Sequence, residues 1–239
     1  MRCQGPAVTS PATANRLLAR LPRRERDRLV GEGTLVELAL GETLVEPGQT
    51  QGAAWFPLTS FVSLVARAKG HEPLEMDLIG NEGMLGATLV LGVDTVPLRG
   101  VVQGAGSALR IGLRPFKRCL KRSPVLQRSL QRYLYVVLAQ RAQSAVCTRF
   151  HEVNPRLARW LLMIHDRTQG DQLHLTHQFL ADMLGVRRSA VTIAAGHLQE
   201  RGIIHYQRGE IRVLDRAALE AQACECYAEV VLDYDELLG

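Results

Sequence analysis

Apolar and polar positions are patterned most clearly near the carboxyl end of the chain, where they predict two short helices joined by a tight turn. From residue 176 to 184 the large apolar residues fall on one helical face, and Gly185 follows the last of them. A glycine at this point lets the chain enter the left-handed conformation that ends many helices. A second helix is predicted from Arg187 until Gly202 ends it, with Val191 and Leu198 on its inward face.

Two β-prone runs follow at 203–206 and 210–213, joined by the glycine-containing segment Gln207-Arg208-Gly209. Short runs separated in this way predict a β-hairpin. Helix, turn, helix and hairpin in this order make a winged helix-turn-helix, which is a DNA-binding motif. We therefore expect the stretch from 174 to 214 to bind double-stranded DNA.

The predicted second helix has polar residues on its exposed face, close to its first turn. In helix-turn-helix proteins this end of the helix enters the major groove, where an arginine can hydrogen-bond guanine O6 and N7 together. Arg188 is the predicted principal base reader, with Ser189 and Thr192 reading adjacent base edges. Arg187 is expected to reach a phosphate or a base, and Arg208 in the hairpin to reach a phosphate.

The amino-terminal half has a different pattern. Residues 15–30 predict a short helix that is capped by Asn15 and broken or kinked at Pro22. Beyond it, short β-prone runs separated by glycine-containing turns predict a single antiparallel β domain, a sandwich, roll or barrel. These runs are 34–38, 55–56, 61–66, 74–79 and 100–103.

A long helix is predicted between the two halves. Ser123-Pro124 is a helix start signal and Asn154-Pro155 a stop signal. Apolar residues recur along it at spacings of four, three and four, as in a coiled coil. They are expected to form a dimer interface on a helix that also packs partly on its own β domain: Leu126, Leu130, Tyr133 and Val137. A helix with intramolecular contacts alone is the alternative. Another helix, 155–167, should connect to the DNA-binding motif, with the bend at Asn154-Pro155 as hinge.

Composition narrows the possible classes. The chain has 239 residues, 46% of them hydrophobic and 22% charged, as in ordinary globular proteins. No apolar run is long enough for a transmembrane helix and no secretory signal is recognisable, so a cytoplasmic protein with no membrane partner is expected. The net charge of +5 suits a nucleic-acid partner. The segment 215–239 carries seven acidic residues against one arginine, so it is expected to lie away from DNA or to be partly disordered.

The order of β domain, long helix and winged helix-turn-helix resembles the CRP/FNR family of bacterial transcription regulators over residues 30 to 215. The stretch 40–48 is similar to the family's early glycine-framed turn, and 80–86 stands in the place of its phosphate-binding cassette. Residues in the motif also match: Thr176, Gln178, Gly185, Arg188 and Val191. The resemblance implies that Thr176 and Gln178 contact phosphates, and that RNA polymerase is a partner.

This resemblance defines the fold class as α+β. It implies an amino-terminal antiparallel β-roll, a double-stranded β-helix of the cyclic-nucleotide-binding type, followed by a long dimerisation helix and a winged helix-turn-helix. The expected divisions are a mobile amino terminus (1–14), a β-roll sensor domain with flanking short helices (15–122), the dimerisation helix (123–153) and the DNA-binding domain with an acidic carboxyl-terminal helix or tail (154–239).

The family's effector site is where the chain departs from the pattern. The resemblance places a small-molecule pocket at Glu82, Gly83, Leu85, Gly86 and Arg99. Cyclic-nucleotide-binding members have an arginine followed by Ser or Thr and Ala, and this signature is absent here. Arg99 is displaced by about one position, which turns a strand side chain to the opposite face. Neither cAMP nor cGMP is therefore expected, and the β-roll is either a ligandless scaffold or a pocket for another molecule.

Other cofactors are not expected either. Only Cys3 lies in the first hundred residues, which argues against the family's iron–sulfur cluster, and the five cysteines are too scattered for a disulfide framework. A single histidine such as His71 or His151 is more often an ordinary surface or core side chain than an axial haem ligand. Cys224 and Cys226 with His205 are a weak metal signal, so no metal site is expected. His174 and His177 are expected to face solvent or phosphate.

The sequence thus predicts a homodimeric transcription regulator that binds a near-palindromic operator. The alternative is a small-molecule sensor that acts mainly through protein contacts, with DNA binding weak or lost. An enzyme is not expected, because no catalytic triad, metal cluster or GxxxxGK[ST] phosphate loop is recognisable. Activating relatives often have a glutamate after the base-reading arginine, and Ser189 stands at that position. The usual half-site of the family is therefore not expected.

Overall fold

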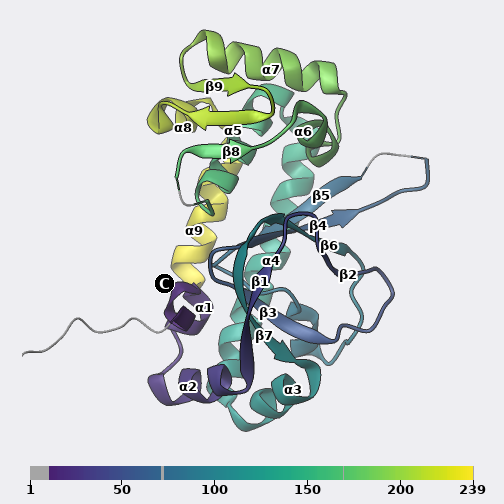
Figure 1. Ribbon diagram of the computed structural model, residues 1–239, viewed down its shortest axis with the longest axis vertical. Helices are drawn as coiled ribbons and strands as arrows, with labels where there is room; N and C mark the ends of the chain where they lie inside the picture. The colour runs from purple at the N-terminus through teal and green to yellow at the C-terminus, as the bar shows by residue number, and fades with distance from the viewer. Residues whose placement is uncertain (1–10, 71–72, 169, 239) are drawn as a thin grey trace, which may run out of the picture.

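The computed structural model describes residues 11–70, 73–168 and 170–238. The molecule is elongated, with a β-rich part at one end, a helix-turn-helix part at the other and the long helix α4 connecting them (Figure 1). This mixed α+β architecture confirms the predicted fold class. Among the described residues, no helix combines the length and apolar character that a membrane span requires. The predicted mobility of residues 1–14 falls largely outside the described residues.

The predicted amino-terminal helix is divided at Pro22, as expected. A 3-10 turn at Pro11–Ala14 precedes α1 (Arg16–Ala19), and α2 (Arg23–Gly31) begins directly after the proline. The Asn15 side chain caps α1 by accepting a hydrogen bond from the Leu18 amide at 3.2 Å. It also donates to the carbonyl oxygens of Pro57 and Gly83, both at 2.9 Å. This buried asparagine therefore fixes the amino-terminal helices onto the β domain.

The β domain consists of two antiparallel sheets, with orders β1-β7-β3 and β2-β6-β4-β5. All five predicted strands are present, and β2 and β7 are additional. The strands are β1 (Gly33–Leu38), β2 (Thr43–Val45), β3 (Ala53–Pro57), β4 (Phe61–Ala66), β5 (Leu74–Ile79), β6 (Arg99–Gly104) and β7 (Gly106–Gly112). A 3-10 segment at Ala87–Leu91 follows the cassette-like stretch. The strand β7 was not predicted because its apolar residues are interrupted by Arg110, which lies over the Trp55 ring.

Two helices follow the β domain, α3 (Leu113–Arg122) and the 27-residue α4 (Pro124–Phe150). Ser123 caps α4 by accepting from the Leu126 amide at 3.1 Å, so the predicted start is confirmed. The face predicted for the dimer interface is wrong. Leu126, Leu130, Tyr133 and Val137 are at most 5% exposed, because α4 uses this face to pack on its own β domain.

The bend after α4 also lies earlier than predicted. The helix ends at Phe150, His151 has extended backbone dihedrals, and α5 (Val153–His165) begins after Glu152. Asn154 and Pro155 therefore lie in the first turn of α5 rather than at the break. A proline is tolerated there because the first amides of a helix have no intrahelical acceptor.

The predicted helix-turn-helix and wing are confirmed. They comprise α6 (His177–Leu184), α7 (Arg188–Glu200), β9 (Ile204–Gln207) and β10 (Glu210–Val213). A third strand that was not predicted, β8 (Gln172–His174), pairs with β10. One apolar core joins α5, α6, α7 and the wing to Phe61, Val65 and Leu78 of the β domain.

The acidic carboxyl-terminal segment forms two helices, α8 (Arg216–Gln222) and α9 (Cys226–Leu238). The second helix extends away from the helix-turn-helix part. It runs back along α4, and the chain ends beside α1 (Figure 1). Val230 and Tyr234 are buried in the same core as α1 and α4. Over the described residues this segment is therefore helical, and its second helix packs on α4.

Candidate nucleic-acid interface

The first helix of the motif is held at its start by the residue predicted to cap it. Thr176 Oγ1 accepts a hydrogen bond from the Phe179 amide at 3.1 Å. Two residues on, the Gln178 side chain donates to Asp182 at 2.7 Å, one turn along the helix. Both Thr176 and Gln178 are exposed at the amino-terminal end of α6. Because amide N–H groups point outward at a helix start, this end of α6 suits an anion.

The turn between the helices has the predicted geometry. Gly185 adopts φ 63°, a left-handed conformation, and accommodates the change of direction after α6. Arg187 occupies the capping position of α7 and makes no side-chain capping bond. The start of α7 therefore presents free backbone donors together with the Arg187 side chain.

The four residues predicted to contact DNA from the second helix lie together at the exposed start of α7. Arg187, Arg188, Ser189 and Thr192 are each exposed, whereas Val191, Ala194, Ala195 and Leu198 are buried. Thr192 Oγ1 donates to the Arg188 carbonyl at 3.1 Å. Ile193, which sequence reasoning left unassigned, is 59% exposed one turn after Ser189. The small and aliphatic residues thus form one continuous buried face of α7, and the polar residues lie on the opposite, exposed face.

His177 does not face solvent as expected. It is 8% exposed, stacks on the Tyr206 ring with centroids 4.0 Å apart, and its Nδ1 lies 3.0 Å from Thr192 Oγ1. Burial and the nearby Arg188 charge lower the pKa of His177. A neutral imidazole therefore connects α6, α7 and the wing. The side chain of His174 lies outside the described residues, so its predicted exposure stays a prediction.

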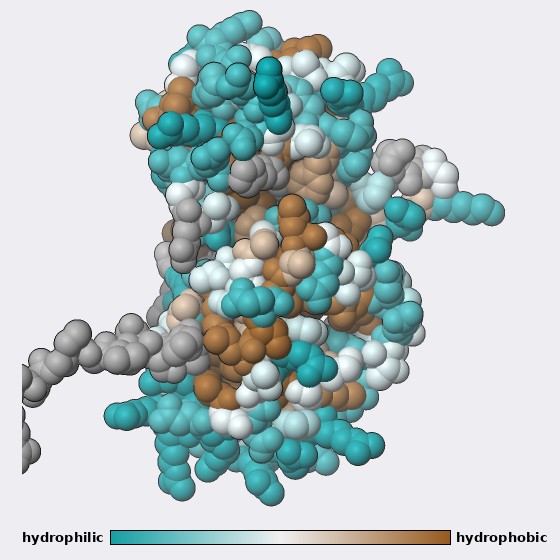
Figure 2. Space-filling view, in the orientation of Figure 1, coloured by the Kyte–Doolittle hydropathy of each residue, from teal (hydrophilic) through white to brown (hydrophobic). Residues whose placement is uncertain are grey.

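The wing is closed by a tight two-residue turn. Arg208 and Gly209 have φ of 50° and 85°, the pair of positive values that a type I′ hairpin requires. Arg208 is exposed at the tip of the hairpin. The view in Figure 2 shows a largely hydrophilic surface over the end of the molecule that carries α7 and the wing. The geometry brings the predicted DNA-contacting residues to one end of the protein.

The residues predicted for the effector pocket do not enclose a common cavity. Glu82 is 6% exposed and pairs with Arg167, which follows α5, at 2.6 Å. Gly83 lies against α4, where an added Cβ would come within 2.4 Å of the Tyr133 hydroxyl. Arg99 lies on the surface and pairs with Glu46 at 3.1 Å. Glu82 and Arg99 therefore already have partners within the chain.

Leu85 and Gly86 do line a cavity between the β-roll and α4, but it is small. Its volume is about 40 Å³, and Tyr133, Val137 and Arg141 of α4 close one side of it. Ligand pockets usually have volumes of about 300 to 1,000 Å³. A nucleotide would therefore require α4 to move away from the β-roll.

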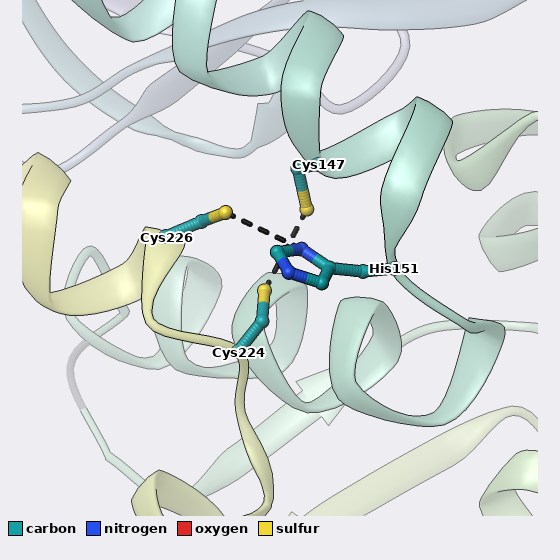
Figure 3. A group of neighbouring side chains, drawn as sticks. All are labelled: Cys147, His151, Cys224 and Cys226. Atoms are coloured by element: carbon teal, nitrogen blue, oxygen red, sulfur yellow. Dashed lines mark hydrogen bonds between the residues drawn. The ribbon is translucent and has the colours of Figure 1, made fainter.

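Four other side chains converge where α4 ends and α9 begins (Figure 3). They are Cys147, His151, Cys224 and Cys226. Sequence reasoning paired the last two with His205, but His205 lies exposed on the wing strand β9 and is not part of this group. A cysteine four residues before a histidine, at the end of a long helix, is the signal that was missed. The hydrogen bond from Cys224 lowers the pKa of the Cys147 thiol, and the nearby positive charge of Arg159 lowers it further.

Comparison with known proteins gives a family match for the carboxyl-terminal part. The family model of the Crp-like helix-turn-helix domain matches residues 155–222. No curated protein matches the sequence significantly. The domain match includes α6, α7 and the wing, and it supports the sequence resemblance described above.

Solved structures match most of the chain at low sequence identity. A CRP/FNR-family transcriptional regulator from Thermus thermophilus has a TM-score of 0.64 and 22% identity, over 80% of this chain and 98% of that one. FixK2 from Bradyrhizobium japonicum has a TM-score of 0.68 and 14% identity over the same shares. The c-di-GMP-responsive global regulator CLP of Xanthomonas campestris has a TM-score of 0.64 and 18% identity, over 80% of this chain and 99% of that one.

Proposed function

Residues 155–222 form a Crp-like helix-turn-helix domain in a chain with the fold of the CRP/FNR transcription regulators, and we propose that the protein binds specific DNA sequences as a homodimer. The observation that carries this proposal is the exposed start of α7. There Arg187, Arg188, Ser189 and Thr192 are all accessible, over a helix whose inward face is fully packed. With α7 in the major groove, Arg188, Ser189 and Thr192 face base edges, and Arg187 at the start of the helix lies beside the phosphates.

The individual roles follow from reach and chemistry. Arg188 hydrogen-bonds guanine O6 and N7, while Ser189 and Thr192 contact neighbouring base edges. Ile193 adds an apolar contact of the kind that recognises a thymine methyl group. Arg187, Thr176 and Gln178 contact phosphates beside the groove, and Arg208 contacts the backbone from the wing. Phosphate contacts position the protein, whereas the α7 contacts select the sequence.

A second copy of the chain is needed to read two half-sites about one helical turn apart. The exposed face of α4 supports such a dimer. Tyr135 and Leu138 are 61% and 64% exposed, although both are large and apolar. They belong to a series with alternating spacings of four and three residues, as in a coiled coil. The series is Gln131, Tyr135, Leu138, Ala142, Ala145 and Arg149.

A two-fold dimer would bind a near-palindromic operator, and the family resemblance implies RNA polymerase as a further partner. The buried contacts of Glu82 and the small cavity beneath α4 favour a β-roll that acts as a scaffold, with any effector bound elsewhere or only after α4 moves.

Selection of genomic fragments by the purified protein, followed by sequencing, tests the proposed DNA binding directly. A palindromic sequence should be enriched; no enrichment at low salt would instead favour a sensor that acts through protein contacts.

Substitution of Arg188 tests the recognition helix. Arg188→Ala should weaken operator binding by about 1 to 3 kcal/mol and relax selectivity at one base pair, because it removes a bidentate base contact. Fluorescence anisotropy with operator duplexes carrying single base changes measures both effects.

Arg208→Ala is the matched control for this prediction. It removes an exposed arginine of the same motif that lies on the wing rather than on α7. It should weaken binding to all sequences alike and reduce the slope of affinity against salt by about one unit. If Arg188→Ala behaved in this same way, or left affinity unchanged, α7 would not be the base-reading helix.

A further inference from the structure

The end of α4, the bend before α5 and the start of α9 meet at a cluster of four metal-ligand side chains. Cys147 and His151 lie one turn apart at the end of α4, and Cys224 and Cys226 border the junction of α8 and α9. All four side chains point toward one centre (Figure 3). Their ligand atoms, three sulfurs and an imidazole nitrogen, all lie within 4.8 Å of one another.

We propose that Cys147, His151, Cys224 and Cys226 bind a single Zn²⁺ ion in a closed tetrahedral site. Three cysteines and one histidine are a common ligand set for structural zinc. With Zn–S bonds of about 2.3 Å and a Zn–N bond of about 2.05 Å, tetrahedral geometry places two sulfurs about 3.8 Å apart and a sulfur and a nitrogen about 3.6 Å apart. The Cys147 and Cys224 sulfurs are 3.6 Å apart, and the Cys226 sulfur lies 3.4 Å from His151 Nδ1.

The histidine is oriented as a zinc ligand should be. Its Nδ1 faces the sulfurs, while Nε2 lies 3.1 Å from a carboxylate oxygen of Glu225. A ligating histidine usually donates its second N–H to a carboxylate or carbonyl, which fixes the ring and its tautomer. The partner comes from the residue between the two cysteines, so the segment 224–226 supplies two ligands and the orienting group together.

Neighbouring groups suit the charge of such a site. Three thiolates around Zn²⁺ leave a net charge of −1. The Gln143 amide donates to the Cys226 sulfur at 3.1 Å, and the Arg159 guanidinium lies 4.0 Å from the Cys147 sulfur. The three cysteines are at most 7% exposed. A site with this burial and a complete set of four ligands has no position for water, which is typical of structural rather than catalytic zinc.

The compactness of the group argues against two other uses of the same residues. A multi-iron cluster needs its ligands spread around a larger inorganic core, whereas these four donor atoms fit around a single ion. A disulfide joins two sulfurs about 2.05 Å apart and leaves the other two ligands unused. It also gives no reason for the imidazole to face the sulfurs.

The ion would fasten the carboxyl-terminal helix to the interdomain bend. Cys147 lies in the last turn of α4, and His151 is the residue at which the chain bends. Cys226 is the first residue of α9. Since a structural metal ion contributes its binding free energy to the folded state, loading should stabilise the contact between α9 and α4. This role concerns the architecture of the chain and does not depend on DNA binding.

The test begins with the full-length protein purified without chelators or added metal. Elemental analysis should find about one zinc per chain, and removal by a chelator under reducing conditions should lower the thermal midpoint. Replacement of zinc by Co²⁺ should give the visible absorption of tetrahedral cobalt together with thiolate-to-cobalt charge transfer. This absorption reports the ligands directly.

Variants then assign the ligands. Cys224→Ser and His151→Ala should each lose stoichiometric zinc, while Cys119→Ser, at a buried cysteine outside the group, should retain it. Glu225→Gln keeps all four ligands and should weaken zinc affinity roughly 10- to 100-fold, as measured by competition with a chromophoric chelator. Because Glu225 is exposed, this variant keeps the proposal testable even if a cysteine variant folds poorly.

Two results would overturn the proposal. One is a protein that contains no zinc as purified and gives no thiolate-to-cobalt absorption when Co²⁺ is added to the reduced chain. The other is a native chain whose mass is lower by two hydrogens, with a Cys147–Cys224 disulfide identified by peptide mapping. The second result would make the group a redox pair rather than a metal site.

Discussion

Two carboxyl groups on β5 lie where the helix-turn-helix part meets the β domain. The Glu75 carboxylate accepts hydrogen bonds from the Ser63 hydroxyl and from Trp160 Nε1 of α5, the latter at 2.7 Å. Asp77, which is buried, lies 3.6 Å from the Arg141 guanidinium of α4. Burial raises the pKa of Glu75 to about 7 and that of Asp77 to about 6. Both groups therefore bind protons more tightly in the folded chain.

This pKa shift predicts the direction of a pH effect. Between the ordinary glutamate value of 4.5 and about 7, folded Glu75 holds more protons than unfolded Glu75. The stability that it contributes is therefore fully present below pH 4.5 and declines as pH rises to 7. Glu75→Gln, which is uncharged at every pH, should remove about 1 to 2 kcal/mol of this decline, allowing for partial solvent exposure.

Urea unfolding at a series of pH values measures this effect as the difference between variant and wild type. The exposed Glu37→Gln on β1 serves as control and should retain the wild-type slope. An unchanged slope in Glu75→Gln would mean that the carboxylate is as well solvated in the folded chain as in the unfolded chain.

Among the elements, α4 shows most clearly where a sequence pattern stops being informative. Its start at Ser123 follows from local capping, which the sequence contains in full. Its orientation does not, because apolar residues occur both on the face of Leu130 and on that of Leu138. Only contact with the β domain decides which face becomes internal. Helical periodicity alone therefore predicted the element but assigned the wrong face to the dimer.

The two candidate sites, the helix-turn-helix surface and the cysteine and histidine group, also differ in how far the sequence predicts them. The residues on α6, α7 and the wing are close in sequence, so periodicity, capping and turn chemistry were sufficient to predict their arrangement. The cysteine and histidine group combines residues about 75 positions apart. Its assembly depends on α9 returning along α4, and no local pattern encodes that path. Long-range contacts of this kind require the folded chain.

The exposed series of α4 residues that includes Tyr135 and Leu138 gives a prediction about a single element. Leu138→Glu places a charge in the middle of the proposed coiled-coil interface and should convert a dimer into a monomer at micromolar concentration, because an unpaired buried charge is costly. Leu35→Glu makes the same replacement at an exposed leucine of β1, outside α4, and should remain dimeric. Sedimentation equilibrium distinguishes the two. Equal association of both variants would place the interface elsewhere.

At the scale of the whole molecule, polar contacts join the β domain to the helix-turn-helix part within an apolar junction. The Arg167 guanidinium donates to Glu82 through Nε at 3.0 Å and Nη2 at 2.6 Å, and to the Met163 carbonyl at 2.6 Å. Both charged side chains are nearly inaccessible, at 6% and 7%. Glu82 also accepts from the Gly80 amide at 2.9 Å. The cassette-like loop of the β domain thus holds the segment that follows α5.

The ion pair between Arg167 and Glu82 should couple the stability of the β domain to that of the helix-turn-helix part. Arg167→Met leaves a buried carboxylate without its partner and should cost about 3 to 5 kcal/mol of unfolding free energy. Glu82→Gln keeps an oxygen for the Gly80 amide but removes the charge, so the double variant Glu82→Gln/Arg167→Met should cost less than the sum of the two single variants. Denaturant unfolding of the four proteins gives the coupling energy, and limited proteolysis at the bend around Glu152 reports whether the parts separate before they unfold. Additive costs with no increase in cleavage would show that the apolar contacts of Phe61, Val65 and Leu78 hold the junction without help from the ion pair.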